Sequence, residues 1–235
     1  MNLPVLATMA LGGLAALDAT PVAQTLFSQP LVTATVLGWI WGDLTVGLQV
    51  GMVLQLLAAS TLPVGARTPE DYAVGGVVGA GVALALSHRL PFEMAHDACC
   101  LIGVFAGLIT ATLGVALLKW QRRRNEGLAR WCEAAVRAGS EGALGQAHLA
   151  AITLAFAIGA AWTAFAFAAF VWALAPLAEH ESLKLAHAWE LAQPLWLGLG
   201  LAALLNGFLQ RRLARAAVFG AAMLATWLVL MLGGR

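Results

Sequence analysis

Acidic, amide and basic side chains interrupt long apolar stretches in the first third of the chain. The strongest candidates for binding a ligand are Asp18, Gln55, Arg67 and Asp71. Polar groups in hydrocarbon are costly unless they face a partner or a wet cavity, so such residues indicate a functional site. Carboxylates and amides exchange hydrogen bonds with hydroxyl-rich solutes such as sugars. The residue types therefore predict a polar substrate-binding site.

Further polar residues of the same region extend this candidate site. They are Gln24, Gln29, Asp43, Gln49 and Glu70. Two interpretations stay open for Asp43, which is either a site residue or the N-cap of the apolar run that follows it. Arg67 and Asp71 stand four residues apart and could pair only with each other. Trp39 and Trp41 could offer a sugar an aromatic plane, although interface anchoring or packing is the favoured interpretation.

The sequence contains none of the usual arrangements for covalent or metal chemistry. It has no nucleotide-binding loop and no nucleophile placed near a base. Cys99, Cys100 and Cys132 lack metal-ligand spacing, so we expect reduced, small apolar side chains. His88 and His96 stand alone in a connector. We therefore expect that this chain alone is not an enzyme and holds no cofactor or metal.

The composition is that of an integral membrane protein. Of 235 residues, 61% are hydrophobic and 11% are charged, whereas soluble domains have about 25% charged residues. Basic residues form two clusters and not a general coat, which argues against nucleic-acid binding. We expect an all-α polytopic fold with about 6–8 hydrophobic segments. These would form one membrane domain over residues 1–235.

The N-terminal part, residues 1–118, contains unusually short apolar segments. Residues 3–17 and 31–41 fall below the ~20 residues that a spanning helix needs. Short, interrupted segments of this kind indicate broken or re-entrant helices around a transport site. Residues 38–57 carry glycines four apart, which permit close helix packing. This part is predicted to hold both the site and the re-entrant segments.

The remaining chain is divided by a basic connector. Residues 119–146 mix arginines with tryptophan and leucine, which predicts an amphipathic helix on the membrane surface. The positive-inside rule places this connector in the cytoplasm. Residues 147–235 are predicted to form C-terminal membrane helices, with a second cytoplasmic basic cluster at residues 211–215. The predicted location is the cell inner (cytoplasmic) membrane, crossed several times.

An ordered set of short motifs resembles a known family. The set is Leu17-Asp18, Gln29-Pro30-Leu31-Val32, the glycine-spaced residues 38–55, and Val64-Gly65-Ala66 followed by Asp71. It resembles the N-terminal half of the mannose/fructose/sorbose-type IIC component of the phosphotransferase system (PTS). The resemblance covers roughly residues 12–85.

The resemblance implies a permease subunit that binds and translocates a hexose-like sugar. It implies a hetero-oligomer with a IID membrane subunit. Cytoplasmic IIA and IIB phosphocarrier proteins would relay phosphate to the sugar. Carried over residue by residue, the sugar site would comprise Asp18, Gln55, Arg67 and Asp71. The chain departs from the family pattern at Gln29, where arginine is common. This departure leaves open a membrane scaffold or sensor in a regulatory phosphorelay. The size and hydropathy of the chain also leave open a vitamin-binding subunit of an unrelated uptake system.

Overall fold

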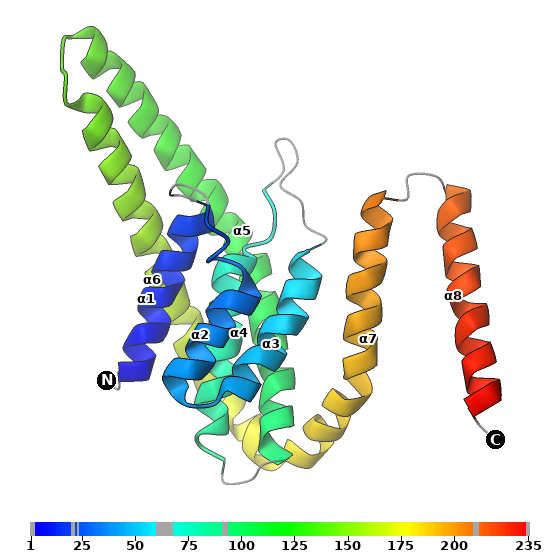
Figure 1. Ribbon diagram of the computed structural model, residues 1–235. Helices are drawn as coiled ribbons and strands as arrows, with labels where there is room; N and C mark the ends of the chain where they lie inside the picture. The colour runs from blue at the N-terminus through cyan, green and yellow to red at the C-terminus, as the bar shows by residue number, and fades with distance from the viewer. Residues whose placement is uncertain are drawn as a thin grey trace.

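The structure describes residues 3–19, 22, 24–59, 68–90, 94–208 and 212–233, and the regular secondary structure among them is α-helical. The structure is a computed structural model, shown in Figure 1. Its helices are α1 (Leu3–Ala19), α2 (Pro30–Trp41), α3 (Leu44–Ala58), α4 (Tyr72–Ser87), α5 (Met94–Arg137), α6 (Ala143–His180), α7 (Ser182–Phe208) and α8 (Arg212–Gly233). The prediction of an all-helical fold is confirmed.

Length and composition distinguish α5 and α6 from the four N-terminal helices. By length and composition, α5 and α6 are long and apolar enough to cross a membrane. Helices α1 to α4 have 17, 12, 15 and 16 residues. At about 1.5 Å per residue, none of these four matches a hydrocarbon core of about 30 Å. These four helices are therefore as short as the sequence predicts.

Helix α4 is the centre of the bundle, since nearly its whole length is buried. Its glycines allow α5 to approach at backbone distance. A Cβ on Gly75 would lie 2.7 Å from the carbonyl oxygen of Gly107, and one on Gly79 would lie 2.7 Å from that of Gly103. Glycine is needed here because a side chain at either position would displace α5.

Helices α2 and α3 form a tight hairpin. Gly42 ends α2 in the left-handed conformation, with φ 81°, and Asp43 caps α3 through the Val46 amide. Beyond the turn, a Cβ on Gly47 would lie 2.5 Å from the Ala34 carbonyl oxygen. The glycines of α3 therefore form a packing face against α2. Asp43 is the N-cap that one of the two sequence interpretations predicted.

The basic connector differs from its prediction. Residues 119–137 do not form a separate surface helix but continue α5, whose 44 residues run without a break to Arg137. The physical reason is that this stretch has no proline, and its one glycine, Gly127, is tolerated inside a helix. Gly139, with φ 87°, then turns the chain into α6. Figure 1 shows the resulting α5–α6 hairpin projecting beyond the short helices.

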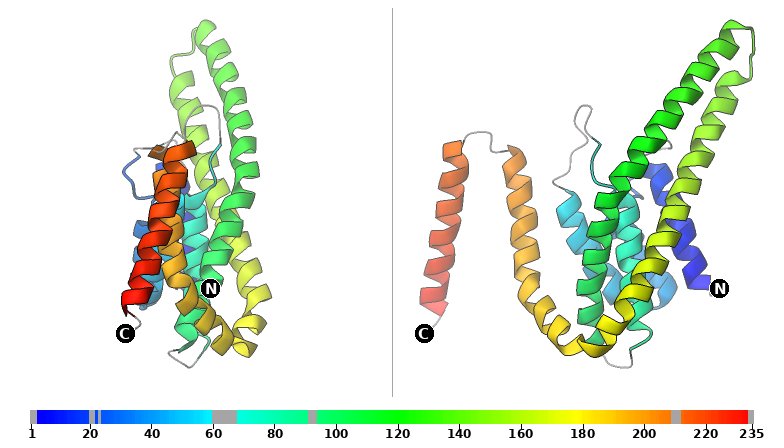
Figure 2. Two further views of the ribbon diagram at one scale, coloured as in Figure 1. Left: turned by 90° about the vertical axis from the view of Figure 1, so that its right-hand side faces the viewer. Right: turned by 180° about the vertical axis from the view of Figure 1, so that it is seen from behind.

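The two C-terminal helices stand to one side. Helix α7 packs on α5, where Phe105 and Trp196 make an edge-to-face contact with ring centroids 6.1 Å apart. It also contacts α3, because Gly200 lets Leu56 approach closely. Figure 1 and the right view of Figure 2 show α8 beyond α7, away from α1 to α6.

Candidate functional site

Asp18 organises the segment that connects α1 to α2. One carboxylate oxygen accepts hydrogen bonds from the Thr25 amide at 2.6 Å and the Thr25 hydroxyl at 2.7 Å. The other accepts one from the Ser28 amide at 2.8 Å. The enclosed segment contains Gln24 and Leu26 at φ 51° and 69°, a left-handed conformation that is uncommon for residues other than glycine. Asp18 therefore fixes a segment whose backbone would not adopt this shape unaided.

Gln55 holds the next residues of the same segment from α3. Its side-chain amide donates to Gln29 Oε1 at 2.6 Å. Its own oxygen accepts from the Leu31 amide at 3.4 Å. The Gln55 side chain thus satisfies a backbone donor at the start of α2, where helical amides lack internal partners. Asp18 and Gln55 hold the 25–31 segment from opposite ends.

Replacing Asp18 by alanine is expected to release this segment. Three hydrogen bonds to a carboxylate would be lost, and bonds to charged groups contribute about 1.5–3 kcal/mol each. We expect chymotrypsin to cleave after Leu26 or Phe27 at least about tenfold faster than in the wild type. The control is Thr25→Val, which removes the hydroxyl but keeps both amide donors. Equal cleavage of Asp18→Ala and the wild type would contradict the role of this carboxylate.

Asp71 lies in the connection before α4 and is fixed between α4 and α5. Its Oδ1 caps α4 through the Val74 amide at 3.2 Å, and its own amide donates to the Ala111 carbonyl oxygen at 3.0 Å. Its side chain packs against Gly114, where an added Cβ would lie 2.8 Å from the Asp71 Cβ. Among described residues, no hydrogen bond is made to Oδ2. A carboxylate oxygen can accept a hydrogen bond from a ligand hydroxyl.

These elements enclose a cavity of about 330 Å³. Its polar wall comes from the connection before α2, the connection before α4, and the part of α5 beyond Leu118. The polar residues are Ser28, Gln29, Glu70, Asp71, Tyr72, Gln121, Arg122 and Asn125. The volume falls within the range of about 300–1,000 Å³ that is typical of small-molecule sites. Carboxylate, amide, hydroxyl and guanidinium groups together suit a ligand that has many hydroxyls.

The structure brings three of the four predicted site residues to one end of the bundle. Asp71 lines the cavity itself. Asp18 and Gln55 lie behind its wall and hold Ser28 and Gln29, which do line it. The fourth predicted residue, Arg67, lies outside the described residues.

Three cavity residues on α5 were missed from the sequence. Gln121 is buried, Arg122 donates to the Thr68 hydroxyl at 3.1 Å, and Asn125 Oδ1 is buried without a hydrogen-bond partner in the described part of the chain. They lie about 50 residues after Asp71, in a stretch whose composition predicts a surface helix. The available signal was the i, i+4 spacing of the two amides in a stretch without helix breakers.

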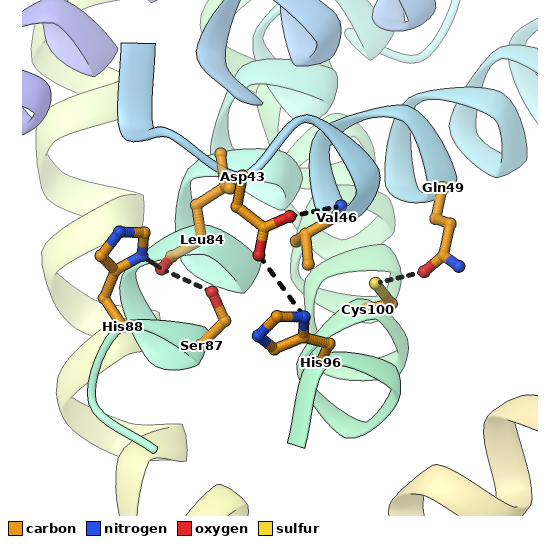
Figure 3. Close-up of polar contacts among 8 residues, drawn as sticks. All are labelled: Asp43, Val46, Gln49, Leu84, Ser87, His88, His96 and Cys100. Atoms are coloured by element: carbon orange, nitrogen blue, oxygen red, sulfur yellow. Dashed lines mark hydrogen bonds and ion pairs between the residues drawn. The ribbon is translucent and has the colours of Figure 1, made fainter. Parts of the chain in front are cut away.

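A second polar cluster lies at the other end of the α2–α3 hairpin (Figure 3). Asp43 Oδ2 lies 3.5 Å from His96 Nδ1, and Gln49 Oε1 accepts from the Cys100 thiol at 3.1 Å. Trp41 is also at this end and donates its indole N–H to Thr8 at 3.1 Å. Trp39, on the same helix, is 78% exposed. None of these side chains lines the cavity, where the aromatic residue is Tyr72.

Two comparisons with known sequences match proteins of the same description. A family model described as "PTS system sorbose-specific iic component" matches residues 3–233. A curated relative, the "PTS system sorbose-specific EIIC component" of Klebsiella pneumoniae, is 32% identical over 90 residues. Those residues are 35% of this chain and 33% of the relative, so the match spans about a third of that protein's length.

Comparison with solved structures shows a shared membrane-protein fold. A structure described as "Structure of membrane protein" matches with a TM-score of 0.69. The alignment covers 97% of this chain and 96% of that protein's chain. The "CryoEM Structure of Mannose Transporter ManYZ and Microcin E492 (MceA) complex" has a TM-score of 0.60, covering 97% and 95%. Sequence identity is 16% in both cases. At this identity the likeness establishes the fold.

Proposed function

Because the chain belongs to the family of PTS sorbose-specific IIC components, we propose that it binds and translocates a hexose-like sugar. Members of this family are transport components, so the chain is a membrane permease subunit and not a catalyst on its own. The observation that supports sugar binding is the cavity in which Gln29, Asp71 and Asn125 meet. These side chains come from three separate parts of the sequence. A hollow whose carboxylate and amide groups converge from separate elements suits a small polar solute.

Each wall has a distinct role in the proposal. Asp71 Oδ2 accepts a hydrogen bond from a sugar hydroxyl, and Tyr72 offers its ring or hydroxyl from the adjoining position. Asp18 and Gln55 contribute by holding Ser28 and Gln29 in place. Movement of the 25–31 segment would change the wall of the cavity.

The amide of Asn125 gives a direct test of sugar contact. Its buried oxygen lacks a partner among the described residues, so a sugar hydroxyl that donates to it would satisfy an otherwise unpaired acceptor. We expect Asn125→Ala to raise the KM of uptake about tenfold and to change the maximal rate less. The control is Glu126→Ala, because Glu126 is the next residue, is exposed and does not line the cavity. An unchanged KM in Asn125→Ala would place the sugar elsewhere.

The proposal includes membrane and cytoplasmic partners. We propose a IID subunit beside this chain, with IIA and IIB proteins supplying the phosphoryl group, in a hetero-oligomer of the inner membrane. The fold shared with a mannose transporter complex supports the membrane partner. Family membership supports the phosphocarrier proteins.

Reconstitution tests the proposed function as a whole. The chain is expressed in a strain lacking hexose uptake, with and without its IID and IIA/IIB partners. Uptake of radiolabelled sorbose, mannose and fructose is then measured. We expect accumulation of at least one sugar, as its phosphate ester, only when all components are present. Absence of uptake with all partners present and correctly inserted would instead favour the regulatory alternative.

A further inference from the structure

The projecting α5–α6 hairpin carries a second hollow, separate from the sugar cavity. We call it the arginine groove. It measures about 710 Å³, and its principal lining residues are Trp120, Arg123, Arg124, Leu128, Arg130 and Leu154. Five of these belong to α5 and the last to α6. Basic and apolar side chains both line the groove, so it combines two chemistries.

Ion pairing distinguishes the cations of the arginine groove from the neighbouring cations. None of Arg123, Arg124 and Arg130 has a carboxylate partner among the described residues. Arg124 instead lies over the Trp120 ring, 5.0 Å from its centroid. Neighbouring cations differ: Arg137 pairs with Glu133, and Arg122 binds Thr68 beside the sugar cavity. Three guanidinium groups that line one groove are complementary to an anion.

The position of the groove along α5 matches a membrane interface. Residues 98–118 carry no charged side chain, and 21 residues of helix span about 31 Å, close to the hydrocarbon thickness. Lys119 and Trp120 follow at once, and tryptophan is enriched at membrane–water boundaries. Leu154 of α6 lies at the same level because it lines the same groove. The groove therefore begins where the apolar part of α5 ends, on the side that its arginines mark as cytoplasmic.

We propose that the arginine groove binds the head group of an anionic phospholipid from the cytoplasmic leaflet. The guanidinium groups would bind the phosphate, and Leu128 and Leu154 would contact the apolar part of the same molecule. Basic pockets between helices at the cytoplasmic surface are suited to such head groups. A phospholipid suits both the basic and the apolar side chains that line the groove, whereas a soluble phosphate ester suits only the basic ones. This inference is independent of the proposed sugar transport.

Lipid binding to the purified full-length chain tests the proposal. Native mass spectrometry would measure the affinity for phosphatidylglycerol and for phosphatidylcholine with the same acyl chains. We expect tighter binding of phosphatidylglycerol to the wild type. In R123Q/R124Q/R130Q that affinity should fall at least about tenfold, since each basic residue contributes substantially to attraction of anionic lipid. R123K/R124K/R130K keeps the charge and should retain most of the affinity.

A matched control removes the same charge elsewhere. R89Q/R137Q/K184Q deletes three cations that do not line the groove, and it should bind phosphatidylglycerol like the wild type. Glycerol 3-phosphate is added as a soluble competitor and should not displace the lipid at equal concentration. Equal loss in both glutamine triples, equal affinity for both lipids, or displacement by glycerol 3-phosphate would each overturn the proposal. Circular dichroism and elution volume confirm that the variants compared are folded.

Discussion

Replacing Asp71 by asparagine is expected to lower sugar uptake between about tenfold and a hundredfold while leaving the protein folded. Asparagine keeps an oxygen that can accept from the Val74 amide, so the cap of α4 survives. What is lost is the negative charge of a side chain that lines the cavity. A hydrogen bond to a charged group contributes about 1.5–3 kcal/mol, which corresponds to that range of uptake. Initial rates of radiolabelled uptake, normalised to the protein in the membrane, provide the measurement.

Asp43 offers a matched control for this substitution. It caps α3 through the Val46 amide at 3.1 Å, much as Asp71 caps α4, but it lies at the other end of the α2–α3 hairpin. Asp43→Asn should therefore leave uptake close to the wild-type rate. If both variants lost uptake equally, the effect of Asp71→Asn would come from helix capping and not from sugar contact. Wild-type uptake in Asp71→Asn would show that this carboxylate does not bind the sugar.

Adding a single methyl group at Gly47 is expected to destabilise the protein by about 1–3 kcal/mol or more. Its Cβ would lie 2.5 Å from the Ala34 carbonyl oxygen and 2.8 Å from the Gly38 Cα. Both are backbone atoms, so no side chain can rotate away, and α3 must move from α2. That movement would also separate Gln55 from Gln29, which are linked across the same hairpin. Gly47→Ala should therefore lose both thermal stability and uptake.

Thermal unfolding in detergent measures the loss at Gly47, with Gly145→Ala as the control. Gly145 lies in α6, is exposed and has no atom within 4 Å of an added Cβ. Alanine is favoured over glycine inside helices by roughly 0.5–1 kcal/mol, so this control should be neutral or slightly stabilising. A melting temperature for Gly47→Ala that matched Gly145→Ala would show that the α2–α3 contact is not as close as described.

Local signals in the sequence predict much of the N-terminal architecture. The apolar segments before residue 60 are short, so the sequence predicts short helices there. A helix that spans a bilayer needs about 20 residues. Glycines four apart predict close packing, and the contacts of Gly47 on α2 show that outcome. Asp18 and Gln55 were identified because polar groups beside hydrocarbon need partners. Their partners are the 25–31 segment of the chain itself, which a list of polar residues does not reveal.

Long-range features of the site were not predictable in the same way. Asn125 reaches the cavity only because α5 continues past Leu118 as one unbroken helix, whereas the polar composition of this stretch predicts a separate surface helix. Pairing of Asp71 with Ala111 and Gly114 depends on how α4 and α5 pack, which is a tertiary property. Trp39 and Trp41 of α2 could offer a sugar an aromatic plane by sequence alone. They do not line the cavity, whereas Tyr72 does.

Sugar-dependent protection of a cysteine in the cavity wall tests the central claim most directly. Ser28→Cys places a thiol in the wall, while native Cys132 lies on α5 outside the cavity and serves as an internal control. Maleimide labelling at both positions is followed with and without saturating amounts of the sugar that is taken up. The account predicts that sugar slows labelling at position 28 at least about fivefold, by occupying a small enclosed site, and leaves Cys132 unchanged. Labelling at position 28 that is unaffected by a transported sugar would contradict it.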